Sequence, residues 1–283
     1  MNNSKNDTEY SVIEEEQNKT KLKENWEVAF GLQRVDYLTP SKYMVNLANE
    51  NIAGKITYNE VEDNLKTHYN SSSEINYSER EADEVSIRIV KLLNDRSFSF
   101  SIATFKEYHK ILFEGINIGI DEKYIGNFRE ENIHKKEPVL NGETVIYADY
   151  RNIEETLKYD FEEESRQRYA KMPPEKMIER ISNFTSSIWQ VHPFREGNTR
   201  TTAVFIQKYL NSRGFNVKND LFKDNSIYFR NALVRSNYAN YKEGIDVDFS
   251  YLYAFFENLL LGKNNVLDNK LLYIDLPERN ENR

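Results

Sequence analysis

The sequence of 283 residues contains no cysteine. This absence excludes disulfide bonds, thiol catalysis and zinc sites built on cysteine. Glycine and proline are also scarce, with 10 and 6 residues. A chain with few turn-forming residues has few turns and long elements, which favours helices over a barrel or sandwich of short strands. We therefore expect an all-α fold, with the 19 Tyr and 16 Phe filling a helical core.

No run of about 18 apolar residues is present, so the sequence predicts no membrane-spanning helix. The first 25 residues are polar and lack the apolar stretch of a signal peptide, so we expect a cytoplasmic protein. The formal net charge is −8, whereas a nucleic-acid binder normally presents a basic surface. These features predict protein or small-molecule partners, and neither a membrane nor a nucleic acid.

Changes in composition divide the chain into three expected parts. Residues 1–20 are rich in Asn, Lys, Glu and Ser, which is typical of a mobile tail. A helical pattern begins at Trp26, and the Asn-Ser-Ser-Ser run at 70–73 is typical of a linker. We therefore expect a small helical unit over 21–69 and a main domain over 70–283.

Two apolar helices of the main domain flank a polar loop. The first is predicted over 174–192 and ends where Pro193 follows. Its buried face is formed by Met177, Ile181, Phe184, Ile188 and Val191. The second is predicted over 203–210 and stops before Gly214. Six of the nine residues from His192 to Arg200 are polar or charged, which makes this loop the candidate site.

The residue types in this loop suit phosphate chemistry. Gly197 permits unusual backbone conformations, and the first turn of the next helix presents free N–H groups to an anion. Arg200 adds a planar fork that matches phosphate oxygens, and Glu196 adds one hard carboxylate suited to Mg²⁺. His192 can act as a general base near neutral pH. Together these groups predict transfer from a nucleotide to a hydroxyl.

Each of these residues also has an ordinary interpretation. A histidine at a helix end is usually only polar, and Arg200 could pair with Glu196 as a surface ion pair. Phe194 is expected to be a core anchor for the loop. The spacing of these residues alone supports the catalytic and the ordinary interpretation of the loop about equally.

The loop resembles the signature of the Fic (filamentation induced by cAMP) family, His-x-Phe-x-Asp/Glu-Gly-Asn-Gly-Arg-x-x-Arg. The matching residues are His192, Phe194, Glu196, Gly197, Asn198 and Arg200. The resemblance extends over about 82–275, with similar stretches at 112–115 and 126–129. It implies a Fic-type helical bundle with a small β-hairpin flap, and a protein adenylyltransferase that uses ATP and Mg²⁺.

The resemblance also implies roles for the loop residues. His192 would deprotonate a Ser, Thr or Tyr hydroxyl of a target protein, which could be the enzyme itself. Glu196 would hold Mg²⁺ against the α- and β-phosphates of ATP. The anion hole would be formed by Gly197, Asn198 and Thr199, and Arg200 would bind the β- or γ-phosphate.

The expected flap lies around Asn141 and Gly142, because Asn-Gly between two apolar runs is a strong hairpin signal. In the family the flap docks the target segment by strand-like pairing. The flap residues expected to do this are Thr144, Val145 and Ile146.

Two residues depart from the signature. Thr199 stands where the family usually has Gly, and its β-branched side chain narrows the expected phosphate hole. Ala203 stands where the family has its second arginine, which binds the γ-phosphate and pairs with an inhibitory glutamate. These departures weaken the expectation of γ-phosphate binding and of the usual inhibition.

Residues 32–65 resemble the small antitoxin partner of some Fic toxins, here within the same chain. Asp36 is the candidate inhibitory residue, in place of the longer Glu, and Glu74 is a weaker candidate. Our hypothesis is a degenerate inhibitory unit whose arginine partner is missing at Ala203. The alternative is that this unit only packs on the core.

Two further interpretations of function stay open. A Fic-fold enzyme could transfer another group, such as UMP or phosphate. Alternatively, Thr199 and Ala203 favour a catalytically weak nucleotide-binding regulatory module. The sequence identifies neither the target protein nor the oligomeric state, with a homodimer among the alternatives.

Overall fold

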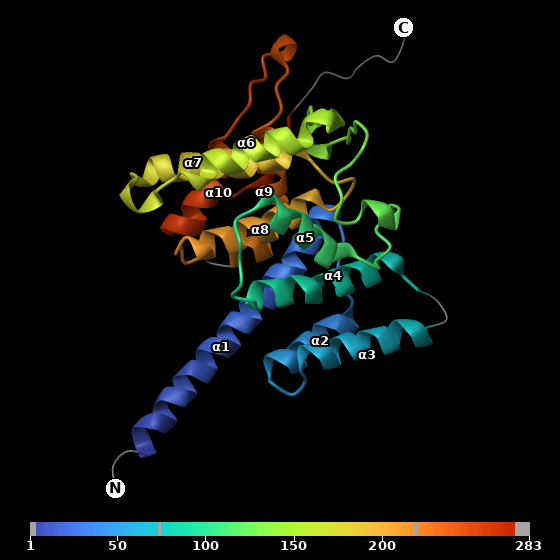
Figure 1. Cartoon of the computed structure of the whole chain (residues 1–283), viewed down its shortest axis with the longest axis vertical. Helices are drawn as coiled ribbons and strands as arrows, with labels where there is room; N and C mark the ends of the chain where they lie inside the picture. The colour runs from blue at the N-terminus through green and yellow to red at the C-terminus, as the bar shows by residue number, and fades with distance from the viewer. Residues whose placement is uncertain (1–3, 73–74, 218–219, 275–283) are drawn as a thin grey trace.

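A computed structural model describes residues 4–72, 75–217 and 220–274 (Figure 1). The expected all-α fold is confirmed. Among the described residues, the one β-type pairing is an isolated antiparallel bridge between Asn240 and Ile245. The helices are α1 (Ser4–Gln33), α2 (Lys42–Ile52), α3 (Tyr58–Ser71), α4 (Tyr77–Asn94), α5 (Ile102–Phe113), α6 (Ile153–Ser165), α7 (Pro174–Val191), α8 (Asn198–Ser212), α9 (Asp220–Arg235) and α10 (Ser250–Leu261). Across the described ranges, no helix combines the length and the apolar character needed to cross a bilayer.

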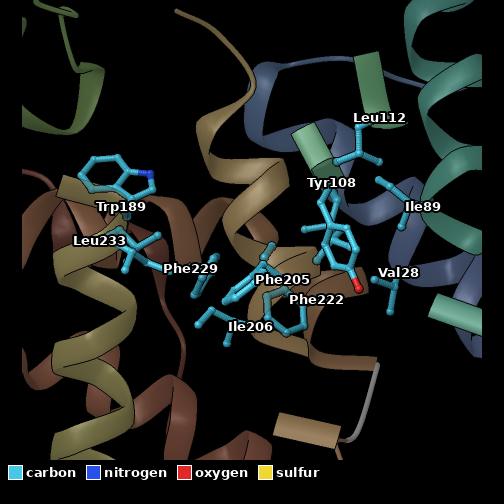
Figure 2. Close-up of a cluster of buried hydrophobic side chains, with 14 of the residues drawn as sticks. Val28, Ile89, Tyr108, Leu112, Trp189, Phe205, Ile206, Phe222, Phe229 and Leu233 are labelled. Atoms are coloured by element: carbon cyan, nitrogen blue, oxygen red, sulfur yellow. The ribbon is translucent and has the colours of Figure 1, made fainter. Parts of the chain in front are cut away.

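Helix α8 lies at the centre of the core. Its residues from Asn198 to Leu210 are all buried, so the helix is surrounded by other elements on every side. Figure 2 shows Phe205 and Ile206 of α8 near Phe222 and Phe229 of α9. Because α8 begins at the end of the candidate loop, the most buried helix of the domain fixes the position of that loop.

The second half of α1 belongs to the same core. Trp26 and Val28 are buried, and α1 packs against α4 and α9. At Gly31 the approach to α9 is so close that an added Cβ would lie 2.6 Å from the Cα of Lys223. The helix extends back to Ser4, whereas the sequence led us to expect a tail over 1–20.

Helices α2 and α3 are joined to α4 by a buried polar network, and Figure 1 shows the pair on one side of α4. The Ser41 hydroxyl donates to Asp83 Oδ2 at 2.6 Å, and the Tyr69 hydroxyl donates to the same oxygen at 2.6 Å. A short 3₁₀ turn, Arg34–Asp36, links α1 to this unit. The unit is therefore fixed to the main domain, and Asp36 lies at the junction. Glu74 lies outside the described residues.

The predicted β-hairpin flap is wrong. Pro138–Leu140 form a 3₁₀ turn, and Asn141 and Gly142 follow in the left-handed region with φ of 52° and 85°. No residue between 136 and 148 is in a strand. The physical reason is that Val139 and Leu140 are buried in the core, so this apolar run packs inward instead of pairing with the run after Gly142. The segment is a compact loop, called here the 136–148 loop.

Candidate active site

The candidate loop joins α7 to α8 through two left-handed residues. His192 caps α7 with a φ of 47°, and Gly197 precedes α8 with a φ of 74°. A Cβ at Gly197 would lie 2.4 Å from the ring of Phe113, so both the backbone conformation and the space require glycine. The Phe113 ring therefore defines one wall of the turn.

The side chains of Asn198 and Thr199 stabilise the loop itself. The Asn198 amide accepts from the Phe194 N–H at 3.0 Å and donates to the Phe194 carbonyl at 2.8 Å. The Thr199 hydroxyl accepts from the indole N–H of Trp189 at 3.0 Å, which links the start of α8 to α7. Phe194 is fully buried, as expected for a core anchor. In this arrangement, Asn198 and Thr199 offer an anion their backbone N–H groups rather than their side chains.

Arg129 is a buried residue of the site to which the sequence assigned no role, although it ends the 126–129 stretch. Its Nε donates to the His192 carbonyl at 2.8 Å, and its guanidinium also donates to the carbonyls of Val191, Glu131 and Ala148. These carbonyls belong to the end of α7 and to both sides of the 136–148 loop. Arg129 therefore fixes the backbone of the catalytic candidate relative to that loop.

His109 supports the candidate loop from α5. Its Nδ1 accepts from the Gly126 N–H at 2.8 Å, so its other nitrogen carries the proton and donates to the Glu196 carbonyl at 3.1 Å. The ring stacks on Phe194 with centroids 3.9 Å apart. Burial lowers the pKa of His109 to about 4, so the ring is neutral at neutral pH.

His192 is buried and has one nitrogen available for chemistry. Its Nδ1 lies 3.2 Å from the Trp189 carbonyl, which can only accept, so Nδ1 carries the proton and Nε2 keeps its lone pair. Burial, and after it the positive charge of Lys135, lower the pKa of His192 to about 3. A neutral imidazole with a free Nε2 is the form that a general base requires.

The 136–148 loop lies over His192 through Tyr147. The Tyr147 ring stacks on the imidazole with centroids 4.0 Å apart. Of the predicted flap residues, Val145 is buried, Thr144 is half-buried and Ile146 is 82% exposed. The Ile146 carbonyl accepts from the Gln190 side chain of α7. The structure thus places Tyr147, the residue after the predicted flap residues, against the predicted base, in a loop rather than a hairpin.

An alternating chain of charges runs across the site. Glu81 Oε1 lies 2.7 Å from Arg200 Nη2, and Arg200 Nε lies 2.7 Å from Asp36 Oδ2. The second Asp36 oxygen lies 4.0 Å from Lys135 Nζ, which lies 3.7 Å from Glu196 Oε1. Five residues from five segments of the chain therefore place acidic and basic groups in strict alternation.

The sequence-based view that Asp36 lacks an arginine partner is wrong. The partner is Arg200, the first arginine of the motif, instead of the residue missing at Ala203. The Arg200 side chain is 1% exposed, and Gln33 Oε1 accepts from its Nη1 at 3.2 Å. Burial alone would lower the pKa of Arg200, but Asp36 and Glu81 raise it, so the charge persists. The arginine predicted to bind phosphate is thus covered by two carboxylates.

A second buried ion pair anchors the 136–148 loop. Arg230 Nη2 of α9 donates to Glu137 Oε2 at 2.5 Å, and the two side chains are only 4% and 1% exposed. The positive charge of Arg230 also acts on His192 and lowers its pKa, after burial and Lys135. No local pattern predicts this pair, because 93 residues separate its members.

Glu196 is the described residue that best fits a Mg²⁺ ligand. Its half-buried carboxylate accepts from the Gly197 N–H at 3.2 Å and faces Lys135. Among the described residues no group of three or more Asp, Glu or His side chains could bind a metal ion. A single carboxylate fits a Mg²⁺ ion that takes its other ligands from nucleotide phosphates and water.

The fold and the loop define an all-helical domain with a polar turn between α7 and the buried α8. Residues 99–210 match the model of the Fic/DOC family. The chain is also similar to the N-terminal FIC domain of Bep8, a VirB-translocated Bartonella effector protein from Bartonella sp. 1-1C. The TM-score is 0.52 at 16% identity, over 68% of this chain and 94% of that chain, which supports the fold alone.

A search of curated proteins gives no significant match. Fic domains are typically transferases, and the family commonly carries out AMP transfer or another nucleotidyl transfer. The resemblance of the antitoxin-like unit rests on the sequence alone.

Proposed function

We propose that the protein transfers AMP from ATP to a hydroxyl side chain of a protein, which can include the enzyme itself. The observation that supports this most directly is the relation between His192 and α8. A neutral imidazole with a free Nε2 ends one helix, and the next helix begins six residues later, at Asn198, with free N–H groups and Arg200. A base and an anion site are thus held by one rigid turn.

In the proposed reaction, His192 Nε2 accepts the proton of the target hydroxyl, and the oxygen attacks the α-phosphorus of ATP. The new O–P bond forms as the bond to pyrophosphate breaks, and pyrophosphate leaves with the electron pair. Backbone N–H groups of Gly197, Asn198 and Thr199 hold the phosphate oxygens, and Arg200 binds the β- or γ-phosphate. Glu196 would hold Mg²⁺, which supplies further neutralisation of the phosphate charge when bound.

The low pKa of His192 is consistent with this role once nucleotide is present. Lys135, Arg129 and Arg230 all lower the pKa of His192 in the free protein, after the effect of burial. Phosphate groups bound near these cations would offset their charge and raise the pKa of the imidazole toward the working range of a general base. Nucleotide binding would therefore make His192 a stronger base.

The test is incubation of the full chain with Mg²⁺ and α-labelled ATP, γ-labelled ATP or α-labelled UTP, beside the His192→Ala variant. We expect protein-bound label from α-labelled ATP only, and its loss in the variant. Label from γ-labelled ATP would indicate phosphate transfer, and label from α-labelled UTP alone would indicate UMP transfer. ATP binding with no label from any donor would support the regulatory binding module instead.

We also propose that Asp36 inhibits the site. Its carboxylate contacts Arg200 Nε at 2.7 Å, so a nucleotide phosphate and Asp36 compete for one guanidinium. Asp36→Asn is expected to raise labelling several-fold at ATP concentrations below saturation, because the competing charge is removed. The control is Asp63→Asn, an exposed aspartate on α3 of the same unit. Equal labelling by the two variants would show that the unit only packs on the core.

A further inference from the structure

Asp36 lies between two cations that the chain supplies from different segments. Its Oδ2 contacts Arg200 Nε at 2.7 Å, and its Oδ1 lies 4.0 Å from Lys135 Nζ. A carboxylate with one oxygen toward each cation is placed as a phosphate group would be, because both present several oxygens to opposite positive charges. The position of Asp36 therefore marks an anion site between two positively charged side chains, Arg200 and Lys135.

The second cation of this site comes from outside α8. Ala203, fully buried in α8, occupies the place where the resembling signature has a second arginine. Lys135 reaches the same anion from outside the motif, and its Nζ also lies 3.7 Å from the Glu196 carboxylate. The ammonium group is thus beside both the anion position and the carboxylate suited to Mg²⁺.

We propose that Lys135 is a second phosphate-binding residue of the nucleotide site, acting on the phosphates beyond the α-phosphate together with Arg200. The inference rests on the proposed nucleotide site at α8. When nucleotide enters, a phosphate replaces Asp36 between Arg200 and Lys135, and Glu81 remains on Arg200. The ligand class is a nucleoside diphosphate or triphosphate, since a monophosphate lacks the group that would reach this position.

The setting of Lys135 suits this role. Its backbone N–H donates to the Thr144 hydroxyl at 3.2 Å, so the base of the side chain is fixed to the 136–148 loop. The side chain is 39% exposed, and its two carboxylate contacts are long, at 3.7 and 4.0 Å. Long, partly solvated ion pairs are weak, so the ammonium can exchange Asp36 for a phosphate at little cost.

The test is calorimetric titration of the full chain with ATP, ADP and AMP, comparing Lys135→Ala with Lys136→Ala. Lys136 is the next residue and an exposed lysine. The Lys136→Ala variant therefore controls for the loss of one positive charge and for a substitution in this part of the chain. Lys135→Ala is expected to weaken ATP and ADP binding roughly tenfold, the usual scale of a charge-assisted contact, and AMP binding less than about twofold. Thermal unfolding of both variants checks that the fold is intact.

A double-mutant cycle with Asp36→Asn gives a second measurement. If Asp36 competes with phosphate for Lys135, the gain in ATP affinity from Asp36→Asn is smaller in the Lys135→Ala background than in the wild type. Equal effects of Lys135→Ala and Lys136→Ala, with ATP still bound, would overturn the role of Lys135 and leave the proposed function intact. Failure of both the wild type and Asp36→Asn to bind ATP or ADP would overturn both.

Discussion

Replacement of Glu137 by alanine is expected to lower the free energy of unfolding by about 3–5 kcal/mol, because it leaves the buried guanidinium of Arg230 without its carboxylate. The two side chains are 1% and 4% exposed and meet at 2.5 Å, so water cannot take over the role of the carboxylate. Urea unfolding of the wild type and the variant at neutral pH measures the difference. The 136–148 loop should also become more mobile, because Glu137 lies at its start.

Two controls separate the buried charge from other effects. Glu179→Ala removes one partner of an exposed pair with Lys176 and should cost less than about 1 kcal/mol. The double variant Glu137→Leu with Arg230→Met replaces the whole pair by apolar groups and should recover most of the loss. A cost for Glu137→Ala no larger than that for Glu179→Ala would mean that Arg230 finds another partner.

Most helices could be predicted because helix periodicity is a local property of the sequence. The spacing from Met177 to Val191 defines α7, and the capping box of Thr57 and Glu60 that begins α3 is an equally local feature. The hairpin was wrong because Asn141-Gly142 does form a left-handed turn, but the apolar residues before it are needed in the core. Turn chemistry is local, whereas the choice between pairing and burial depends on the whole fold.

The candidate site was predictable only where its residues are adjacent in the chain. The segment from His192 to Arg200 contains the base, the carboxylate and the arginine in one loop, so spacing revealed them. The pair of Asp36 and Arg200 joins residues far apart in sequence, and the contacts of Arg129 with the end of α7 and with Ala148 are equally non-local. No pattern of spacing encodes such contacts, because they arise when α1, the 136–148 loop and α8 pack together.

Acidification is expected to weaken the fold through His109. Its Nδ1 accepts from the Gly126 N–H, so a proton added there would meet a donor and break the contact. Burial lowers the pKa of His109 to about 4, against an ordinary value of 6.5. Between these pH values the unfolded chain binds a proton that the native protein excludes, so stability is full above pH 6.5 and falls as the pH drops toward 4. At pH 5 the loss is about 2 kcal/mol.

The measurement is urea unfolding of the wild type and His109→Gln at pH 7.5 and 5, without nucleotide or magnesium. The variant lacks the titrating ring, so its deficit relative to the wild type should shrink by about 2 kcal/mol at the lower pH. Asp160→Asn gives a control of opposite sign, because burial raises the pKa of Asp160 to about 6 and the native wild type gains a proton in this range. A His109→Gln deficit that is the same at both pH values would show that the native ring accepts a proton, which its contacts with Gly126 and the Glu196 carbonyl should prevent.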